Sequence, residues 1–141
     1  KEPHLFLQAG ADALQTKVAA CTSRDLSQAV YAFGQLRFRH WGTLDVIANH
    51  ITALDCQRLS SFSPQSLSNI VYGCGQLRFQ HDGLLLAICG HLPTRLDECN
   101  HQHTSNIAYS LALLDYRHEP LIYAIVQKLS SNSSSSNQAN R

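Results

Sequence analysis

The chain has 141 residues, which is enough for about one domain. Its 11 Lys and Arg residues against 10 Asp and Glu residues leave a formal net charge of +1, which excludes a strongly basic polyelectrolyte. Any nucleic-acid site must therefore be a local patch. Because no apolar run approaches the roughly 20 residues that span a bilayer, we expect no membrane partner.

The first predicted element is a helix over residues 4–20. It holds the apolar residues Leu5, Phe6, Ala9, Ala13 and Leu14. Because it precedes the first complete copy of a repeated unit, we interpret residues 1–23 as the second helix of a truncated N-terminal repeat.

The segment that follows is present in three copies. Residues 26–40 and 67–81 are identical at ten of fifteen positions and lie 41 residues apart, and a more diverged copy, residues 104–118, follows after 37 more. Repetition at this period is typical of solenoids, in which each unit buries its apolar face only against its neighbours. We therefore predict an all-α fold, an α-solenoid of stacked helix-turn-helix repeats with about seven helices.

Each copy predicts two helices. The first carries one apolar stripe at helical spacing. The stripe consists of Leu26, Ala29, Val30, Phe33 and Leu36 in the first copy, Leu67, Ile70, Val71, Cys74 and Leu77 in the second, and Ile107, Ala108, Leu111 and Leu114 in the third. The second helices are expected at roughly 43–57, 84–97 and 120–130.

Several residues mark the helix ends. Ser23 is expected to precede the first helix of copy one, Pro64 to start that of copy two, and Thr104 or Ser105 to cap that of copy three. Histidines recur at the turn between the two helices of each copy, where a structural capping role is the better interpretation. These are His40, His81 and His118.

These elements divide the rest of the chain into four further segments. They are repeat 1 (24–63), repeat 2 (64–101), repeat 3 (102–130) and a disordered Ser/Asn-rich tail (131–141). The four extra residues of repeat 1 fall in Gln57–Ser66, a polar stretch expected to be a longer loop. Since the sequence starts at Lys1 and contains no methionine, we expect a processed form or a piece of a longer protein.

The positions of the cysteines indicate a structural role rather than a reactive one. Cys74 and Cys89 occupy apolar helix positions, which is typical of buried, reduced thiols. Cys99, His101 and His103 alternate as metal ligands can, but a structural zinc site needs a fourth ligand and none is specified nearby. We expect no metal and no cofactor. Without a nucleophile elbow, a Gly-rich phosphate loop or paired carboxylates, we also expect no catalytic residue and no enzyme.

Two stretches carry a family resemblance. The segments LSNIVYGCGQLRF (67–79) and SNIAYSLALLDYRHEPLI (105–122) resemble octotricopeptide and heptatricopeptide repeats, paired-helix units of organellar RNA-binding proteins in algae and apicomplexans. The resemblance covers roughly residues 4–130, and repeat 1 departs from it with Gln28 where the other repeats have asparagine. It implies an α-solenoid that binds mitochondrial or plastid RNA.

A polar and aromatic row accompanies the apolar stripe on each first helix. Its spacing of i, i+3, i+7 places the row on one face, where amides can read base edges and tyrosine rings can stack on bases. The base-facing candidates are Gln28, Tyr31, Gln35, Asn69, Tyr72, Gln76, Asn106 and Tyr109. Alternatively, the asparagines satisfy backbone groups near helix starts and the tyrosines pack between units.

Arginines recur near the ends of the first helices. Guanidinium groups at unit spacing could contact successive phosphates, and the candidates are Arg37, Arg39, Arg78 and Arg117. The alternative is a solvated helix end, where cations interact favourably with the helix dipole. Repeat 3 has Asp115 in place of the first arginine.

These features predict an RNA-binding protein of limited reach. If each unit reads about one base, three units cover about three nucleotides, too few to select one transcript. We therefore predict an accessory component of a mitochondrial ribosome that holds a short single-stranded segment of ribosomal RNA beside neighbouring proteins. Two alternatives remain open: a plastid mRNA maturation or translation factor, and a protein-binding scaffold of the armadillo or HEAT kind.

Overall fold

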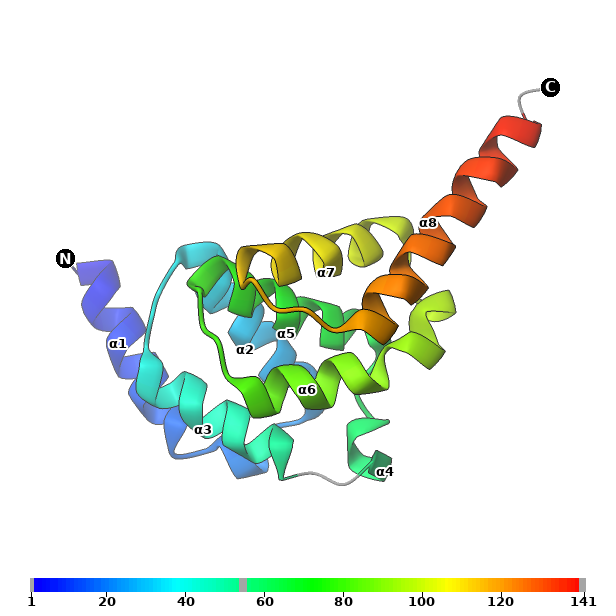
Figure 1. Ribbon diagram of the computed structural model, residues 1–141. Coiled ribbons are helices and arrows are strands. Elements are labelled where there is room, and N and C mark those ends of the chain that lie inside the picture. The colour runs from blue at the N-terminus through cyan, green and yellow to red at the C-terminus, as the bar shows by residue number, and fades with distance from the viewer. Residues whose placement is uncertain (1, 54–55, 140–141) are drawn as a thin grey trace.

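The computed structural model describes the backbone of residues 2–53 and 56–139, and the side chains of residues 4–53 and 58–131. Within these ranges all regular secondary structure is helical, with eight α-helices, two 3-10 helices and no strand (Figure 1). The predicted all-α class is therefore confirmed. No helix in these ranges has both the length and the apolar character needed to cross a membrane.

The helices follow the three copies along the chain. The first helices of the repeats are α2 (Ser23–Leu36), α5 (Pro64–Leu77) and α7 (His101–Leu113). The second helices are α3 (Trp41–Thr52), α6 (Asp82–His91) and α8 (Glu119–Ala139), and α1 (Glu2–Gln15) precedes the first copy. Short elements complete the chain: η1 (Val18–Ala20), α4 (Cys56–Leu59) and η2 (Pro93–Glu98).

Several elements differ from the expected ones. The helix expected over residues 4–20 ends at Gln15 and is followed by η1, and the second helix of repeat 1, expected over 43–57, ends at Thr52. The short helix α4 lies at the start of the stretch predicted as a loop. The second helix of repeat 2 ends at His91 and continues as the 3-10 helix η2, because Pro93 has no backbone N–H to donate to the preceding turn. Helix α8 continues to Ala139 through most of the segment predicted as a disordered tail, which contains neither glycine nor proline.

The N-terminal caps lie one to five residues earlier than expected in two of the three first helices. Thr22, rather than Ser23, caps α2 in a capping box with Asp25, and Asn100, rather than Thr104 or Ser105, caps α7. Helix α5 begins as predicted with Pro64 in its first turn, and the Ser63 side chain accepts from the backbone N–H of Ser66. Each cap satisfies an N–H that the helix itself leaves unpaired.

The first helices all end in the same way. A residue just beyond each helix takes the left-handed conformation, with φ of 53° at Arg37, 58° at Arg78 and 51° at Asp115. Arg37 and Arg78 directly follow α2 and α5, and Asp115 is the second residue after α7. The next residue is aromatic, and its N–H donates back five residues: Phe38 to Phe33, Phe79 to Cys74 and Tyr116 to Leu111. This is the Schellman motif, and in each repeat it turns the chain sharply toward the second helix.

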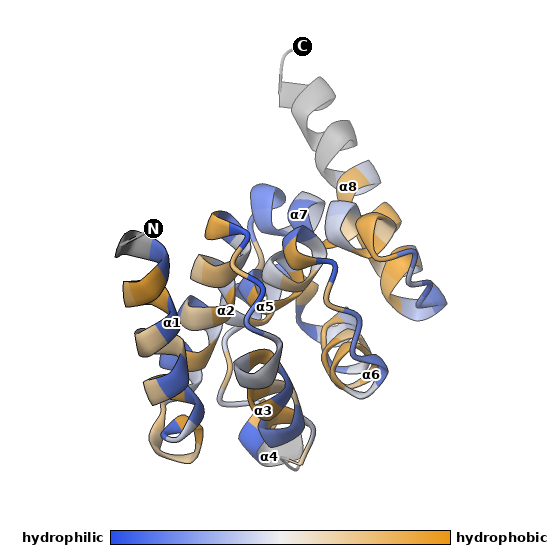
Figure 2. Ribbon diagram, turned by 90° about the vertical axis from the view of Figure 1, so that its left-hand side faces the viewer, coloured by the Kyte–Doolittle hydropathy of each residue, from blue (hydrophilic) through white to orange (hydrophobic). Residues whose placement is uncertain are grey.

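The helices form two layers. In the first, α5 packs between α2 and α7; in the second, α1 packs against α3, α3 against α6, and α6 against α8. Figure 1 shows α1 and α8 at opposite ends of the array, and Figure 2 shows α3 and α6 below the first helices. The first and second helices up to α7 thus contact mainly the equivalent helix of a neighbouring repeat, whereas α8 contacts mainly η2.

Small residues let the first helices approach closely. A Cβ atom built on Gly34 would lie 2.7 Å from the Cα of Gly73, and one built on Gly73 would lie 2.5 Å from the carbonyl oxygen of Val30. At the next boundary, a Cβ on Gly75 would lie 2.9 Å from the Cβ of Ser110. Any larger residue at these glycines would therefore push neighbouring repeats apart.

Most of the predicted apolar stripe is buried, with Ala29 and Ala108 half-buried and Leu36 exposed. All five stripe residues of α5 are at most 1% exposed. In contrast, Leu36 is 57% exposed, although its repeat equivalents Leu77 and Leu114 are 0% and 5% exposed. Leu36 faces the side of α2 on which, within the described residues, no first helix packs, so its assignment to the buried stripe is wrong.

We expect Gly73→Ala to destabilise the protein and Gly90→Ala to stabilise it. The added methyl group at residue 73 meets the backbone of α2, and such overpacking costs about 1–3 kcal/mol. Residue 90 also lies in a helix, but nothing lies within 4 Å of an added Cβ, so alanine should gain about 0.5–1 kcal/mol. Urea unfolding of both variants tests this; equal effects would contradict the close helix contact.

We expect Leu77→Ala to lower the free energy of unfolding by about 2–5 kcal/mol, as other large-to-small core changes do. The repeat-equivalent change Leu36→Ala is the matched control, and because that side chain is exposed it should cost about 0.5 kcal/mol or less. The free energies of unfolding of the two variants are compared with that of the wild type in dilute solution. A loss below about 1 kcal/mol for Leu77→Ala would mean that the stripe is wrongly assigned.

Candidate nucleic-acid interface

The predicted polar and aromatic row lies on the part of each first helix that is not buried. In α5 the only side chains that are not fully buried are Gln65, Ser66, Asn69, Tyr72 and Gln76. In α2, Gln28 and Gln35 are exposed and Tyr31 is half-buried, while in α7 Asn106 is half-buried and Tyr109 is exposed. We name these eight candidate residues the amide–tyrosine ridge: Gln28, Tyr31, Gln35, Asn69, Tyr72, Gln76, Asn106 and Tyr109.

The ridge is continuous between the first two repeats. The ring centroids of Tyr31 and Tyr72 lie 5.5 Å apart with an interplanar angle of 33°. Gln35 Nε2 donates to the Tyr31 hydroxyl at 2.7 Å. Two of the predicted tyrosines therefore contact each other between units, as the structural alternative requires, while remaining partly open to solvent.

A polar cavity opens where the first two repeats meet at this ridge. It has a volume of about 330 Å³, and Gln28 from α2 and the equivalent Asn69 from α5 both line it. The rest of the lining is Ser23, Arg24, Ser27, Ser61, Ser63, Gln65 and Ser66. The volume is at the small end of the range for small-molecule pockets.

The sequence did not indicate this cavity. Its serines and Arg24 come from the N-terminal ends of α2 and α5 and from the segment before α5. Each segment looks like an ordinary polar helix start. Serine and amide residues near the starts of both α2 and α5 are the one signal that could have suggested it.

The ridge lies on an acid-poor layer. The described helices α2, α5 and α7 contain one carboxylate, Asp25, which accepts from the backbone N–H of Thr22 at 3.1 Å. In the second layer, by contrast, α1, α3, α6 and α8 each carry at least one carboxylate. The first layer is therefore the side of the molecule that repels an anionic ligand least.

The predicted phosphate arginines bridge the repeats. Arg37 Nη2 donates to Gln76 Oε1 at 3.1 Å, and Arg39 Nε donates to the Leu77 carbonyl oxygen at 3.0 Å. Arg78 Nη1 donates to the Leu113 carbonyl oxygen of the third repeat. These three arginines and Arg117 remain exposed. Their structural role was not foreseen, because it depends on where the next helix lies.

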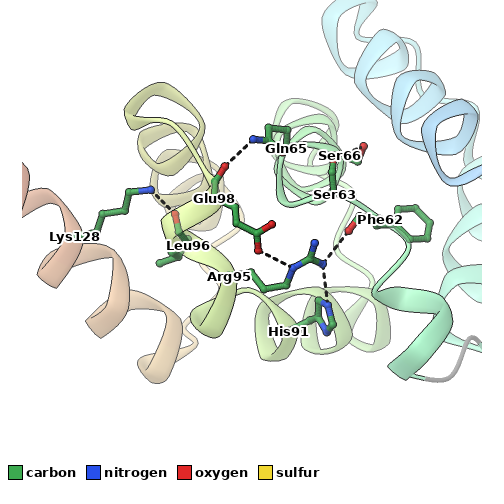
Figure 3. A network of polar contacts seen from close by, with 9 residues as sticks. All are labelled: Phe62, Ser63, Gln65, Ser66, His91, Arg95, Leu96, Glu98 and Lys128. Carbon is green, nitrogen blue, oxygen red and sulfur yellow. Dashed lines mark hydrogen bonds and ion pairs between the residues drawn. The ribbon is translucent and has the colours of Figure 1, made fainter.

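The side chains of two other basic residues near the ends of the repeats, Arg95 and Lys128, donate hydrogen bonds to backbone carbonyl oxygens (Figure 3). Arg95 Nη1 donates to the Phe62 carbonyl oxygen at 2.9 Å and lies 3.1 Å from His91 Nε2. The Lys128 ammonium donates to the carbonyl oxygens of Leu96 and Cys99. Burial, together with the charge of Arg95, lowers the pKa of His91, so that its neutral ring accepts from Arg95.

The three turn histidines cap the second helices, as predicted. The Nδ1 atoms of His40, His81 and His118 accept from the backbone N–H groups of Thr43, Leu84 and Leu121 at 3.0–3.2 Å. The opposite nitrogen, Nε2, lies 2.9 Å from Asp12 Oδ1 in His40 and 3.1 Å from Asn49 Oδ1 in His81. The first two histidines therefore join each repeat to the preceding second helix.

Cys74 and Cys89 are buried thiols, and the alternating Cys-His segment gathers no metal-ligand cluster in the described part of the chain. Burial raises the pKa of Cys74 and of Cys89 to about 12, which keeps both thiols protonated at neutral pH. Cys99 is buried, His101 is exposed and His103 is half-buried. Among the described residues no three His, Cys, Asp or Glu side chains come together as metal ligands would.

Comparison with protein-family models, with curated proteins and with solved structures gives no match. The functional assignment therefore depends on the side chains of this chain. The features that bear on it are the amide–tyrosine ridge, the cavity at the first repeat boundary and the distribution of carboxylates.

We expect His81→Ala to lose both a helix cap, worth about 1 kcal/mol, and the hydrogen bond to Asn49, worth about 0.5–1.5 kcal/mol. A double-mutant cycle with Asn49→Ala should show a coupling energy in that second range. His118→Ala is the matched control. The residue equivalent to Asp12 and Asn49 is here Gly90, which has no side chain to bond to the histidine. This variant should therefore lose only the helix cap. Zero coupling between residues 81 and 49 would disprove the link.

Proposed function

We propose that this chain is an RNA-binding helical-repeat protein. In this proposal its two layers form an α-solenoid, and the amide–tyrosine ridge binds single-stranded RNA. The observation that carries the proposal is the cavity at the first repeat boundary, where the equivalent amides Gln28 and Asn69 line one hollow. Because an amide both donates to and accepts from a base edge, two amides at one-unit spacing suit consecutive bases.

The tyrosines extend this surface. Tyr109 is 56% exposed, and the rings of Tyr31 and Tyr72 are partly open beside the amides. Aromatic faces stack on unpaired bases with little regard to sequence. Splayed, single-stranded nucleotides are therefore the favoured ligand, since bases inside an A-form duplex present no face for stacking.

The bridging arginines suit the phosphates of the same strand. A guanidinium group has five N–H donors, and the hydrogen bond from Arg37 to Gln76 uses a single nitrogen. Arg37 and Arg78 end successive first helices and are exposed. Together with the acid-poor first layer, they would neutralise a backbone that runs across the repeats.

The small number of repeats favours a role inside a larger assembly. Three repeats at about one base each make too small a site to select a transcript. We therefore infer that the chain is an accessory component of a mitochondrial ribosome that holds a short ribosomal RNA segment. The organelle and the ribosome rest on the family resemblance and on this size limit.

We expect Asn69→Ala to relax base preference at a single position of a bound oligonucleotide by about 1–3 kcal/mol, because one amide reads one base edge. The measurement is fluorescence anisotropy of single-stranded RNA oligonucleotides that differ at one position. Gln127→Ala is the matched control, since Gln127 is an exposed amide on α8, outside the first layer. It should leave both affinity and preference unchanged.

The same titrations separate base reading from phosphate contact. Arg78→Ala should weaken binding to all sequences alike and lower the salt slope by about 0.7–1, the loss of one phosphate contact. Asn69→Ala should leave that slope unchanged. Wild-type protein that binds no single-stranded RNA at low salt would contradict the proposal and favour the protein-scaffold alternative.

A further inference from the structure

A tryptophan side chain is exposed at the boundary between the first two repeats. Trp41, the first residue of α3, is 45% exposed and is the only tryptophan in the chain. Its ring stacks on that of Phe79 in the second repeat, with centroids 5.9 Å apart and an interplanar angle of 25°. Phe79 is buried, and its backbone N–H donates to the Cys74 carbonyl oxygen in the turn after α5. The indole is therefore held against the protein while a large part of it remains open to solvent.

The segment that leads to Trp41 connects it to the amide–tyrosine ridge. Residues 37, 39 and 41 are exposed, and the two residues between them are buried or half-buried. The three exposed side chains all contact the second repeat: Arg37 bonds to Gln76, Arg39 to the Leu77 carbonyl oxygen, and Trp41 stacks on Phe79. We name Arg37, Arg39 and Trp41 the boundary strip. Since Gln76 belongs to the ridge, the strip continues the ridge around the end of α2 to the second layer.

The boundary strip lies in a basic region. Together with the exposed Arg78, which directly follows α5, it presents three guanidinium groups. Residues 36–44 and 76–81 contain no carboxylate, and the next ones along the chain are Asp45, one turn further along α3, and Asp82, at the start of α6. Because the three cations outnumber these two carboxylates, the surroundings of the indole favour an anionic ligand.

The equivalent positions of the other two repeats lack this combination. They are Arg78, Gln80 and Asp82 in repeat 2 and Asp115, Arg117 and Glu119 in repeat 3. Asp82 takes the place of Trp41, near Tyr116, the equivalent of Phe79; burial, followed by Cys89 and Asp82, raises the pKa of Tyr116. Of the three repeats, only the first has an aromatic ring with two arginines here. This is the same boundary at which the cavity lined by Gln28 and Asn69 lies.

We propose that Trp41 is a stacking platform for a base of the bound RNA strand, and that Arg39 contacts the adjoining phosphate. This inference rests on the proposed function, because it takes single-stranded RNA as the ligand. An indole face stacks on any base, and a guanidinium group suits the phosphate that each nucleotide carries. An acidic peptide offers carboxylates to the arginines but no flat ring to the indole. The RNA site therefore extends beyond the first layer.

The fluorescence of the single tryptophan reports on this position alone. We expect a single-stranded RNA oligonucleotide to quench it, with the same midpoint as the anisotropy of the labelled oligonucleotide. An abasic oligonucleotide of equal length keeps the phosphates but has no base to stack, so it should leave the fluorescence unchanged. A polyglutamate peptide should do the same. Quenching by either of these as strong as that by RNA overturns the proposal.

Substitutions separate stacking from simple apolar contact. Trp41→Leu should weaken RNA binding about 5- to 150-fold, the loss of one stacked base, whereas Trp41→Phe keeps an aromatic ring and should retain most of the affinity. Tyr123→Leu is the matched control, because Tyr123 is an aromatic residue on α8 that is 68% exposed and lies away from this boundary. It should bind as the wild type does. Arg39→Gln should lower the salt slope by about 0.7–1.

The outcomes distinguish this inference from the proposed function. RNA that binds by anisotropy without quenching Trp41, or that binds Trp41→Leu as tightly as the wild type, overturns the inference and leaves the proposed function intact. An unchanged salt slope in Arg39→Gln overturns the phosphate contact. Wild-type protein that binds no single-stranded RNA overturns both proposals. Circular dichroism of each variant should show the helical content of the wild type.

Discussion

The spacing of the repeats depends on contacts between small residues of neighbouring first helices. Because Gly34 and Gly73 leave no room for a Cβ atom between them, the backbones of α2 and α5 touch. At this separation side chains on the exposed edges of the helices meet, so Tyr31 lies beside Tyr72 and Arg37 reaches Gln76. The glycines therefore determine the geometry of the ridge, although they are buried beneath it.

The left-handed residue after α2 and after α5 adopts a costly backbone conformation and also contacts the next repeat. A residue other than glycine in this conformation costs of order 1 kcal/mol or more, and glycine would avoid that cost. Arginine at this position gives α2 and α5 a side chain that bonds to the next repeat. Asp115 keeps the conformation in the third repeat, where the described residues offer no following repeat to contact.

Several local features of the fold could be predicted from the sequence, although the caps of α2 and α7 were misplaced, and features created between repeats could not be predicted. The stripe of α5, the start at Pro64 and the capping histidines follow from spacing within one copy. The exposure of Leu36 and the acceptors of Arg37 and Arg78 depend on which helix lies alongside. For the same reason the ridge was predictable from its i, i+3, i+7 spacing, whereas the cavity was not, because it forms where segments of two repeats meet.

The nearest-neighbour pattern of helix contacts has a consequence for folding. Since most helices pack mainly on the equivalent helix of an adjacent repeat, many long-range contacts join residues about one repeat apart, and few long loops must close before packing begins. Helix α5 has neighbours on both sides and a fully buried stripe, so structure should nucleate there and spread outward. Opening should begin at the terminal helices, which have one neighbouring repeat, and the amides near α5 should exchange their hydrogens last.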